Sequence, residues 1–362
     1  MRLRSFAVSL LLTFLLFTGT AFSQTFTGLF DGNYAYNFNK PSNQNNQFNN
    51  GVPSRAFDVN SQMFSLNYAE IAVEKKAVPV GFRIDFGFGD TARVVNSYEP
   101  SSADLEHIQQ AFVSLSKDNL QLDLGKFVTP LGAEVIETKD NWNYSRGLLF
   151  TYAIPFYHFG MRATYAASDK ATFAAYVVNG WNNVRDNNPD KSIGLMLTLK
   201  PSDKMTFTAN YLLGKESPAD KDNRRHMFDG ILTYAISPKF TAMANYDYGF
   251  DMIFGARRQW QGVAAYGKIN FNGMDTGLKI VPRYEWFNDK NGFGTGYGQQ
   301  IQEGTITLQM VSKEAGTFWL EYRRDWSDQQ VFTKEKSTGD FLSLNQDIVE
   351  VGYTYSFSKE VK

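Results

Sequence analysis

The chain of 362 residues contains no cysteine, and this absence excludes several kinds of chemistry at once. There is no disulfide framework, no thiol nucleophile, and no zinc or iron–sulfur site built on cysteine. The formal net charge is −1, so no excess of positive charge favours nucleic acid as a partner. After residue 23 no apolar run is long enough to cross a bilayer as a helix. A membrane role would therefore have to use strands.

The first residues have the composition of a secretory signal peptide. Two arginines lie among the first four residues, an apolar run follows at 6–17, and the small residues Ala21 and Ser23 occupy both cleavage-site positions. A short transmembrane anchor is the alternative, but the run is shorter than the ~20 residues that spanning requires. We expect a signal peptide over residues 1–23, cleaved after Ser23, and a single β-barrel domain over residues 24–362. The exported protein would then reach the cell outer membrane.

Apolar and polar residues alternate with period two through most of the remaining chain. This spacing sends successive side chains to opposite faces of a strand. In VGFRIDFGF, residues 80–88, the even positions are apolar while Arg83 and Asp85 lie on the other face. Further rows of this kind occupy residues 26–38, 193–199, 205–213, 228–236, 240–248, 318–322 and 349–357. The pattern predicts an all-β protein with one oily face on each strand.

A soluble β-sandwich would also alternate, but three features favour a transmembrane antiparallel β-barrel. Short turns, such as 117–119, 168–170 and 201–203, alternate with long polar loops, such as 39–61 and 90–106. Transmembrane barrels place short turns on the periplasmic side and long loops outside, and carry aromatic residues at strand ends. The third feature is that charged residues occupy the face opposite the oily row: Arg83, Asp85, Arg162, Asp229, Asp247, Lys279, Arg283, Glu285, Glu321 and Arg323. On the lipid face an arginine or lysine at mid-membrane would cost about 2–4 kcal/mol.

Segments between the turns number about sixteen. Their predicted starts are near residues 25, 63, 79, 107, 120, 157, 171, 192, 205, 227, 240, 259, 276, 301, 317 and 347. The second, twelfth and fourteenth have the weakest patterns, and Pro282 interrupts the thirteenth. A barrel of this size encloses a lumen wide enough for an aqueous channel. The sequence therefore predicts a porin.

The last strand resembles the C-terminal signature by which outer-membrane barrels are recognised for assembly. Gly352, Tyr355 and Phe357 occupy its glycine and aromatic positions, although 358–362 extend beyond the usual terminal aromatic. This resemblance implies the barrel-assembly machinery as a partner. The expected location in the outer membrane also implies lipid and lipopolysaccharide as partners.

The segment 127–156 does not alternate and connects the fifth predicted strand to the sixth on the long-loop side. In porins the third outer loop, which has this rank, folds into the lumen and narrows it. We expect the same here, with acidic side chains of the segment facing basic side chains of the wall across the water path. The acids are Glu134, Glu137 and Asp140, and the bases are Arg83, Arg162, Arg283 and Arg323. The alternative is an outer loop that caps or braces the rim.

Four motifs in this region resemble one family, the outer-membrane porins called porin-2 or OmpL-like. They are GKFVTPLGAEVIE (125–137), NYSRGLLF (143–150), AIPFYHFGMRATY (153–165) and YVVNGWNNVRDNN (176–188). Together they span residues 125–188, about a sixth of the chain, in the family's order. The resemblance implies an outer-membrane β-barrel with a pore, and it implies no particular substrate.

Several short patterns suggest other chemistry but are weak. Asp275-Thr276-Gly277 matches half of an aspartic-protease site, which needs two such carboxylates. The run 186–191 resembles a calcium loop but has Lys191 where that loop has glycine. His158 is expected to face the lumen and could serve a barrel enzyme that acts on lipid, although no compact nucleophile motif accompanies it. We expect no catalytic residue, metal or cofactor.

These patterns together predict a passive outer-membrane channel for small hydrophilic solutes and ions. A non-conducting barrel that anchors or displays its outer loops as an adhesin is the first alternative, and PSNQNNQFNN (41–50) would suit surface contacts. A lipid-acting barrel enzyme is the second. Large porins are often trimers, so a homotrimer is one of the assemblies that we consider.

Overall fold

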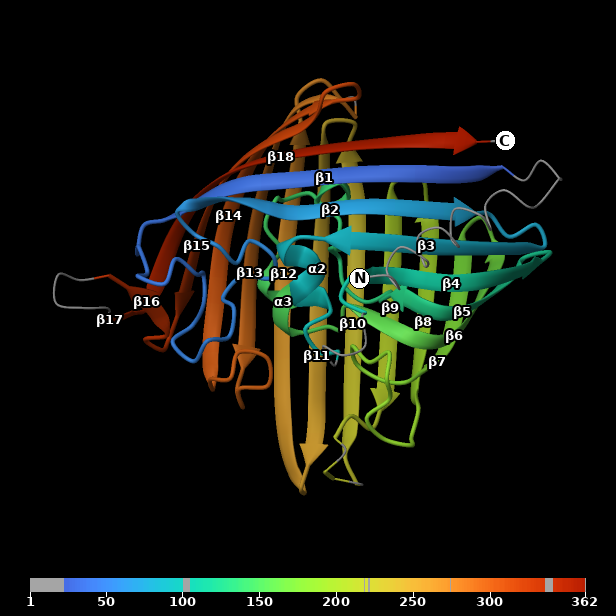
Figure 1. The fold of residues 1–362 in the computed structure, drawn as a ribbon, viewed down its shortest axis with the longest axis horizontal. Helices are drawn as coiled ribbons and strands as arrows, with labels where there is room; N and C mark the ends of the chain where they lie inside the picture. The colour runs from blue at the N-terminus through green and yellow to red at the C-terminus, as the bar shows by residue number, and fades with distance from the viewer. Residues whose placement is uncertain are drawn as a thin grey trace, which may run out of the picture.

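The computed structural model describes residues 23–99, 105–217, 219–220, 222–273, 275–335 and 341–361. Within them, sixteen long strands pair antiparallel in a closed barrel, and the last strand pairs with the first (Figure 1). The strands are β1 (Gln24–Asn37), β2 (Met63–Lys75), β3 (Val80–Phe88), β4 (Ile108–Lys117), β5 (Leu120–Val128), β6 (Tyr157–Ser168), β7 (Ala171–Val178), β8 (Ser192–Ser202), β9 (Met205–Gly214), β10 (Arg224–Ser237), β11 (Phe240–Ile253), β12 (Ala256–Asn270), β13 (Gly277–Asp289), β14 (Gln299–Ser312), β15 (Gly316–Ser327) and β18 (Asn345–Val361). The predicted barrel and its strand number are confirmed, and each predicted start lies within three residues of the observed one. The predicted signal peptide lies outside the described residues except for Ser23.

The two faces of the wall differ as the alternation predicts. On β15, Phe318, Leu320 and Tyr322 are exposed on the outer surface, while Glu321 and Arg323 are buried on the inner one. Apolar side chains thus cover the outside of the barrel, where lipid would contact them. Charged and polar side chains line the inside.

The inner space is packed at the end where the long loops lie. A cluster of buried apolar side chains there combines loop residues with inward residues of the wall, and includes Phe48, Phe57, Leu148, Phe150, Trp260 and Phe287. Near the short turns, by contrast, inward side chains are only half-buried, as at Thr164, Thr172, Thr198, Thr208 and Thr233. The short-turn end of the lumen is therefore the more accessible to water.

One outer connection is much shorter than the rest. β11 and β12 continue to a two-residue turn, Phe254–Gly255, in which both residues have positive φ. Positive φ at both central residues is typical of the hairpin turn whose twist matches that of its strands. The twelfth strand consequently begins at Ala256, three residues before the predicted start, because residues 256–258 continue the ladder instead of forming a loop.

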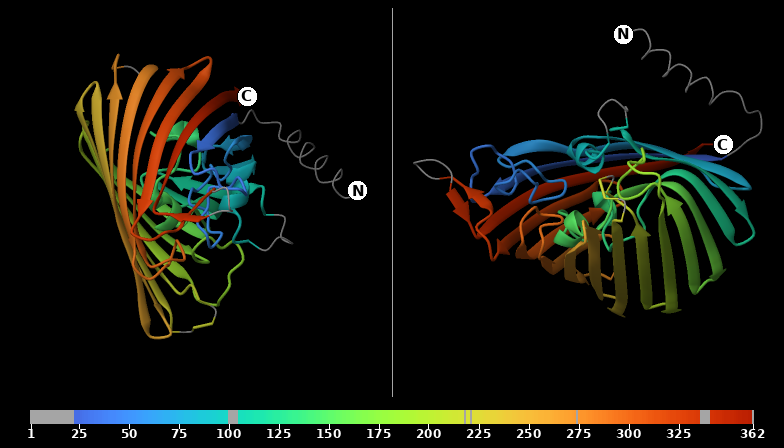
Figure 2. Two further views of the ribbon diagram at one scale, coloured as in Figure 1. Left: turned by 90° about the vertical axis from the view of Figure 1, so that its left-hand side faces the viewer. Right: turned by 90° about the horizontal axis from the view of Figure 1, so that it is seen from below.

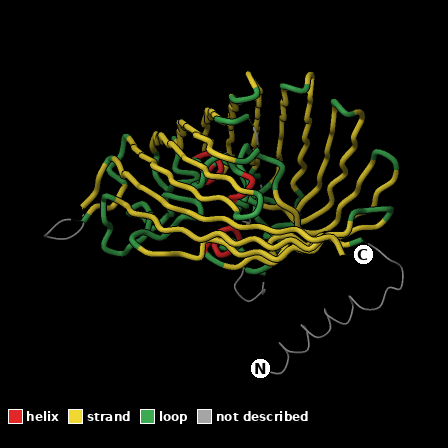
Figure 3. Tube along the Cα trace, turned by 90° about the horizontal axis from the view of Figure 1, so that it is seen from above, coloured by secondary structure: helices red, strands yellow, loops and turns green. Residues whose placement is uncertain are grey.

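Short elements within the long connections were not predicted. They are α2 (Asp90–Val95), η2 (Thr138–Asp140), α3 (Leu148–Tyr152), and a small hairpin of β16 (Phe332–Lys334) and β17 (Phe341–Ser343). Each is too short to show a clear periodicity. Figure 2 shows α3 between the wall of β1–β3 and that of β10–β13, whereas α2 packs against β2 and β3; Figure 3 marks the helices in red. None of the helices among the described residues is long and apolar enough to cross a membrane.

Two irregularities noted in the sequence have simple places in the barrel. Pro282 is exposed on the outer face of β13, and the pairing of β12 with β13 is interrupted between Arg283 and Ile280 because proline has no N–H to donate. The C-terminal residues beyond Phe357 extend β18, so that Val361 pairs with Gln24. The extension therefore lengthens the closing seam of the barrel.

Candidate functional site in the lumen

Residues 129–156, here called the inward segment, cross the lumen between β5 and β6. The backbone N–H of Tyr144 donates to Glu321 Oε2 at 2.8 Å, and the Tyr144 hydroxyl donates to Asp31 Oδ1 at 2.5 Å. The Asn143 amide donates to Thr307 Oγ1 at 2.7 Å. The wall partners belong to β1, β14 and β15, so hydrogen bonds fix the segment to inward-facing side chains.

Two glycines allow the inward segment to approach the wall closely. Gly352 on β18 faces the ring of Tyr144, and a Cβ at this position would overlap the ring. Gly147, at the start of α3, lies against the carboxylate of Glu285 in the same way. The glycine that the sequence assigned to the assembly signature therefore also makes room for the inward segment.

A buried network of charges joins the inward segment to β13, β14 and β15. Arg283 Nη1 lies 2.8 Å from Glu134 Oε1, and its Nε lies 2.7 Å from Glu303 Oε1. Arg323 Nε lies 3.5 Å from Glu303 Oε2, and its Nη2 lies 2.6 Å from Asp325 Oδ1. All five side chains are at most 6% exposed. The structure thus brings together three of the predicted residues: Glu134, Arg283 and Arg323.

The same two wall arginines also hold the backbone of the inward segment. Arg283 Nη1 donates to the Ser145 carbonyl at 2.6 Å, and Arg323 Nη1 donates to the Arg146 carbonyl at 2.6 Å. Arg146, which is buried, donates through Nη1 to the Tyr144 carbonyl at 2.7 Å. Sequence reasoning missed Arg146, although the NYSRGLLF motif that contains it was noticed.

Two other predicted bases have partners on the wall and not on the inward segment. Arg83 Nε lies 2.9 Å from Asp85 Oδ2 on the same strand. Arg162 Nη2 lies 2.8 Å from Asp123 Oδ2 on the neighbouring strand. Both arginine side chains are only partly buried, unlike those of Arg283 and Arg323.

The remaining predicted acids, Glu137 and Asp140, differ in their surroundings. Asp140 is exposed, and its carboxylate forms an ion pair with Lys139 of the same segment instead of with a wall arginine. Burial raises the pKa of Glu137, and the negative charges of Asp85 and Asp140 raise it further. The structure therefore separates these two acids from the Glu134–Arg283 pair.

A second segment also enters the lumen, and the sequence analysis did not anticipate it. Within the first outer loop, residues 38–62, Arg55 is completely buried and forms an ion pair with Asp58. Its Nη2 lies 3.3 Å from Glu350 Oε2, and its Nη1 lies 3.8 Å from Asp325 Oδ2. Burial by itself would lower the pKa of Arg55, but the carboxylates raise it overall. Burial would likewise raise the pKa of Asp58, but Arg55 lowers it overall.

The two inward-folded segments contact each other. The hydroxyl of Tyr152 donates to the Pro53 carbonyl at 2.7 Å. The rings of Phe57 and Phe150 meet edge to face with centroids 5.6 Å apart. These contacts join the first outer loop and the inward segment into one packed layer across the lumen. The only signals in the sequence were the aromatic residues and Arg55 within an otherwise polar loop.

The other singled-out residues do not form a reactive site. His158 is buried, with Nδ1 3.1 Å from the Gly180 carbonyl and Nε2 3.1 Å from Thr129 Oγ1, so both ring nitrogens have partners. Asp186 of the loop that resembles a calcium site forms an ion pair with Lys191. Over the described part of the chain, no group of three or more His, Cys, Asp or Glu side chains is arranged to hold a metal ion.

The assembly-signature aromatics lie on the outer surface. Tyr355 and Phe357 are exposed on the lipid-facing side of β18. The ring of Phe357 covers Gly28 of β1, where a Cβ would overlap it. These two aromatic residues therefore flank the seam that closes the barrel.

A comparison with protein families gives one match that extends over residues 23–357, to the family described as putative beta-barrel porin-2, OmpL-like. The chain belongs to this family. It is an outer-membrane β-barrel of the porin type, as the sequence motifs and the closed sixteen-stranded wall indicate. A comparison with curated proteins gave no significant match.

Solved structures share the fold at low sequence identity. The anion-selective porin from Comamonas acidovorans is 10% identical, with a TM-score of 0.61, covering 92% of this chain and 100% of that one. The trimer form of OmpT, an outer membrane protein of Vibrio cholerae, is also 10% identical, with a TM-score of 0.61 and coverages of 92% and 99%. The outer membrane channel DcaP of Acinetobacter baumannii is 13% identical, with a TM-score of 0.58 and coverages of 94% and 99%. At these identities the likeness establishes the fold alone.

Proposed function

We propose that the protein is a passive diffusion channel through which small water-soluble solutes and ions cross the outer membrane. The observation that carries this proposal is the polar, charged inner face of a closed barrel whose outer face is apolar. Such a wall keeps water inside and lipid outside. Membership of a porin family and the likeness to outer-membrane channels support the same function.

In this proposal the inward segment is the constriction that selects solutes. Its Glu134 pairs with Arg283 of the wall, and this buried pair holds the segment across the lumen. Charged side chains that ring a pore determine which ions pass. Glu137, Asp140, Arg83 and Arg162 would contribute from the more accessible surface.

The test is planar-bilayer conductance of the purified protein, with reversal potentials measured in asymmetric salt. We expect discrete conductance steps, together with swelling of liposomes in small sugars that falls off as solute size increases. If the protein shows no conductance and no liposome swelling, the channel proposal is contradicted. That result would favour the barrel that only anchors or displays its loops. Residues Asn46 and Phe48 of the first outer loop are buried, which makes that loop a poor surface for display.

Export by a cleaved signal peptide over residues 1–23 and assembly as a homotrimer complete the proposal. The trimer form of the Vibrio cholerae protein supports the homotrimer. N-terminal sequencing of the mature protein should begin at Gln24. Chemical cross-linking in the membrane should give a band at three times the monomer mass, and only monomer would contradict the trimer.

We also propose that the protein has no enzymatic activity. The enclosed position of His158, with both ring nitrogens engaged, supports this. Purified protein incubated with phospholipid should release no fatty acid. Release that disappears in a His158→Ala variant would contradict the proposal.

A further inference from the structure

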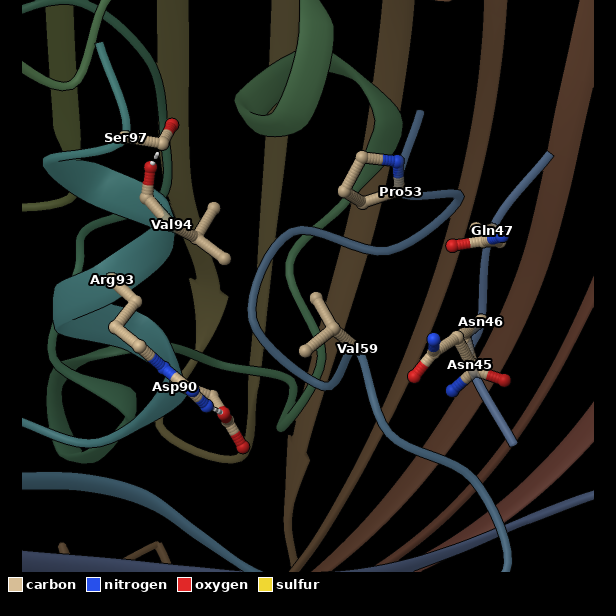
Figure 4. A pocket seen from close by; sticks show the side chains of 9 residues that line it. All are labelled: Asn45, Asn46, Gln47, Pro53, Val59, Asp90, Arg93, Val94 and Ser97. Atoms are coloured by element: carbon tan, nitrogen blue, oxygen red, sulfur yellow. Dashed lines mark hydrogen bonds and ion pairs between the residues drawn. The ribbon is translucent and has the colours of Figure 1, made fainter. Parts of the chain in front are cut away.

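A cavity of about 410 Å³ lies between the first outer loop and α2 (Figure 4). We propose that it binds an uncharged, hydroxyl-rich solute such as a sugar. This inference rests on the proposed channel function and specifies a class of solute. The volume falls within the range of small-molecule sites in proteins.

Two amide side chains give the cavity unused hydrogen-bonding capacity. Asn45 and Gln47 line it and are half-buried, and within the described residues neither side chain has a hydrogen-bond partner. The neighbouring Asn46, by contrast, is fully engaged, because its amide donates to the carbonyls of Asp58 at 2.9 Å and Asn60 at 3.1 Å. An amide offers both donors and an acceptor, which matches a sugar hydroxyl that can act as either.

The charged groups of the cavity compensate each other. Arg93 forms an ion pair with Asp90 within α2, and Asp90 Oδ2 also accepts a hydrogen bond of 2.7 Å from the Asn60 amide. Figure 4 shows this pair on one side of the cavity and Asn45–Gln47 on the other. With no uncompensated charge, the cavity offers no electrostatic advantage to an ionic ligand.

Apolar side chains complete the wall. Val94 lines the cavity from α2, and Val59 and Pro53 line it from the first outer loop. A sugar presents C–H groups as well as hydroxyls, so a mixed wall of amides and aliphatic carbons suits both of its surfaces.

The position of the cavity connects it to the proposed path. Both of its walls belong to connections on the long-loop side, after β1 and after β3. The carbonyl of Pro53 accepts the hydrogen bond from Tyr152 of the inward segment. The cavity therefore lies among the outer connections, next to the layer that the inward segment forms.

The experiment measures equilibrium binding by calorimetry with the folded full-length protein in detergent, so that its outcome does not depend on conduction. Maltose is the neutral probe, and glucuronate and glucosamine are the charged ones. We expect maltose to bind at least as tightly as either charged sugar. Asn45→Ala and Gln47→Ala should each weaken maltose binding by about fivefold, the usual effect of losing one hydrogen bond.

Asn49→Ala is the matched control, because Asn49 is an exposed asparagine of the same loop that does not line the cavity. Its affinity for maltose should equal that of the wild type. Absence of maltose binding, or an equal loss in all three variants, would overturn the inference. Purified lipopolysaccharide is titrated separately, and binding of lipopolysaccharide without binding of maltose would also overturn it.

Conductance separates this inference from the proposed function. A channel that conducts but does not bind maltose would leave the proposed function standing and refute the sugar site. A protein that binds maltose but does not conduct would refute the channel and leave the site standing.

Discussion

At the scale of single residues, Arg283 depends on its two carboxylate partners. Its guanidinium is completely buried between Glu134 and Glu303, and it also donates to the Ser145 carbonyl. A buried charge is tolerated when its partners and hydrogen bonds replace the water that it has lost. Each partner depends on Arg283 in return, because without it Glu134 would lie buried without a cation and Glu303 would keep only the longer contact to Arg323.

The first prediction concerns this dependence. Arg283→Met should lower the free energy of unfolding by about 3–5 kcal/mol, because it leaves Glu134 and Glu303 without their shared cation. Arg324→Met is the control, since both Arg324 and its partner Asp347 are partly exposed and such an ion pair is worth about 0–1 kcal/mol. Urea unfolding from lipid vesicles measures the free energy of unfolding of both variants. Equal losses in the two variants would contradict the argument.

The second prediction concerns Glu137 and pH. Its folded-state pKa is raised by burial, so the folded protein binds the proton more tightly than the unfolded chain does. The carboxylate therefore destabilises the fold above the folded-state pKa, and this effect disappears below the ordinary value of 4.5. Glu137→Gln should raise the thermal midpoint at pH 7 and leave it unchanged at pH 4. A shift of equal size at both pH values would contradict this reading.

At the scale of elements, the lumen is narrowed by two segments and not by one. The first outer loop is held by Arg55 among carboxylates of β15 and β18, and the inward segment is held by Arg283 and Arg323. Each segment thus has its own electrostatic attachment to the wall. The aromatic contact of Phe57 with Phe150 couples the two.

The third prediction concerns the attachment of the first outer loop. Arg55→Met removes its ion pairs while keeping much of its length, so the loop should leave the lumen more often and the mean single-channel conductance should rise. Arg93→Met is the control, because Arg93 is largely exposed on α2. Conductance in planar bilayers is the measurement, and an unchanged value in Arg55→Met would contradict the prediction.

A disulfide offers an independent check, because the chain has no other cysteine to interfere. Gln346 donates to Ser54 Oγ at 3.2 Å, which brings β18 and the first outer loop together. In a Ser54→Cys, Gln346→Cys variant, oxidation should hold the loop in place and keep conductance low. Reduction should restore the wild-type value.

The sequence predicted the wall far better than the contents of the lumen. Period-two alternation is local, so the strands from 24 to 361 could be assigned from neighbouring residues alone. Arg55 and its partner Glu350 are 295 positions apart in the sequence, and Glu134 and its partner Arg283 are 149 positions apart. No local pattern encodes ion pairs between such distant residues. Composition indicated that 127–156 was unusual, but it could not reveal that 38–62 enters the lumen as well.

At the scale of the whole molecule, alternate residues of each strand face different surroundings. One set lies on the outer face, toward lipid, and the other lines the lumen. Leu195 is exposed on the outer face of β8, and Thr198, three positions later, is half-buried on the inner one. The same strand therefore provides a lipid-facing site and a lumen-facing site for one substitution. This comparison keeps strand, sequence neighbourhood and added side chain constant.

The fourth prediction uses this pair. Leu195→Arg should make folding into lipid vesicles less favourable by about 2–4 kcal/mol, because the charge would lie in hydrocarbon. Thr198→Arg should change it little, because water can reach the new charge. Equal losses would show that lipid does not cover the outer face of β8.

The pairing of Gln24 with Val361 has a consequence for biogenesis. The two strands that meet at the seam come from opposite ends of the chain, so this junction can form only after every other strand is available. Until then the growing sheet has two unpaired edges, each able to pair wrongly with another chain. Contacts of such long sequence separation form slowly. The interval before closure is therefore when the chain most needs protection from aggregation.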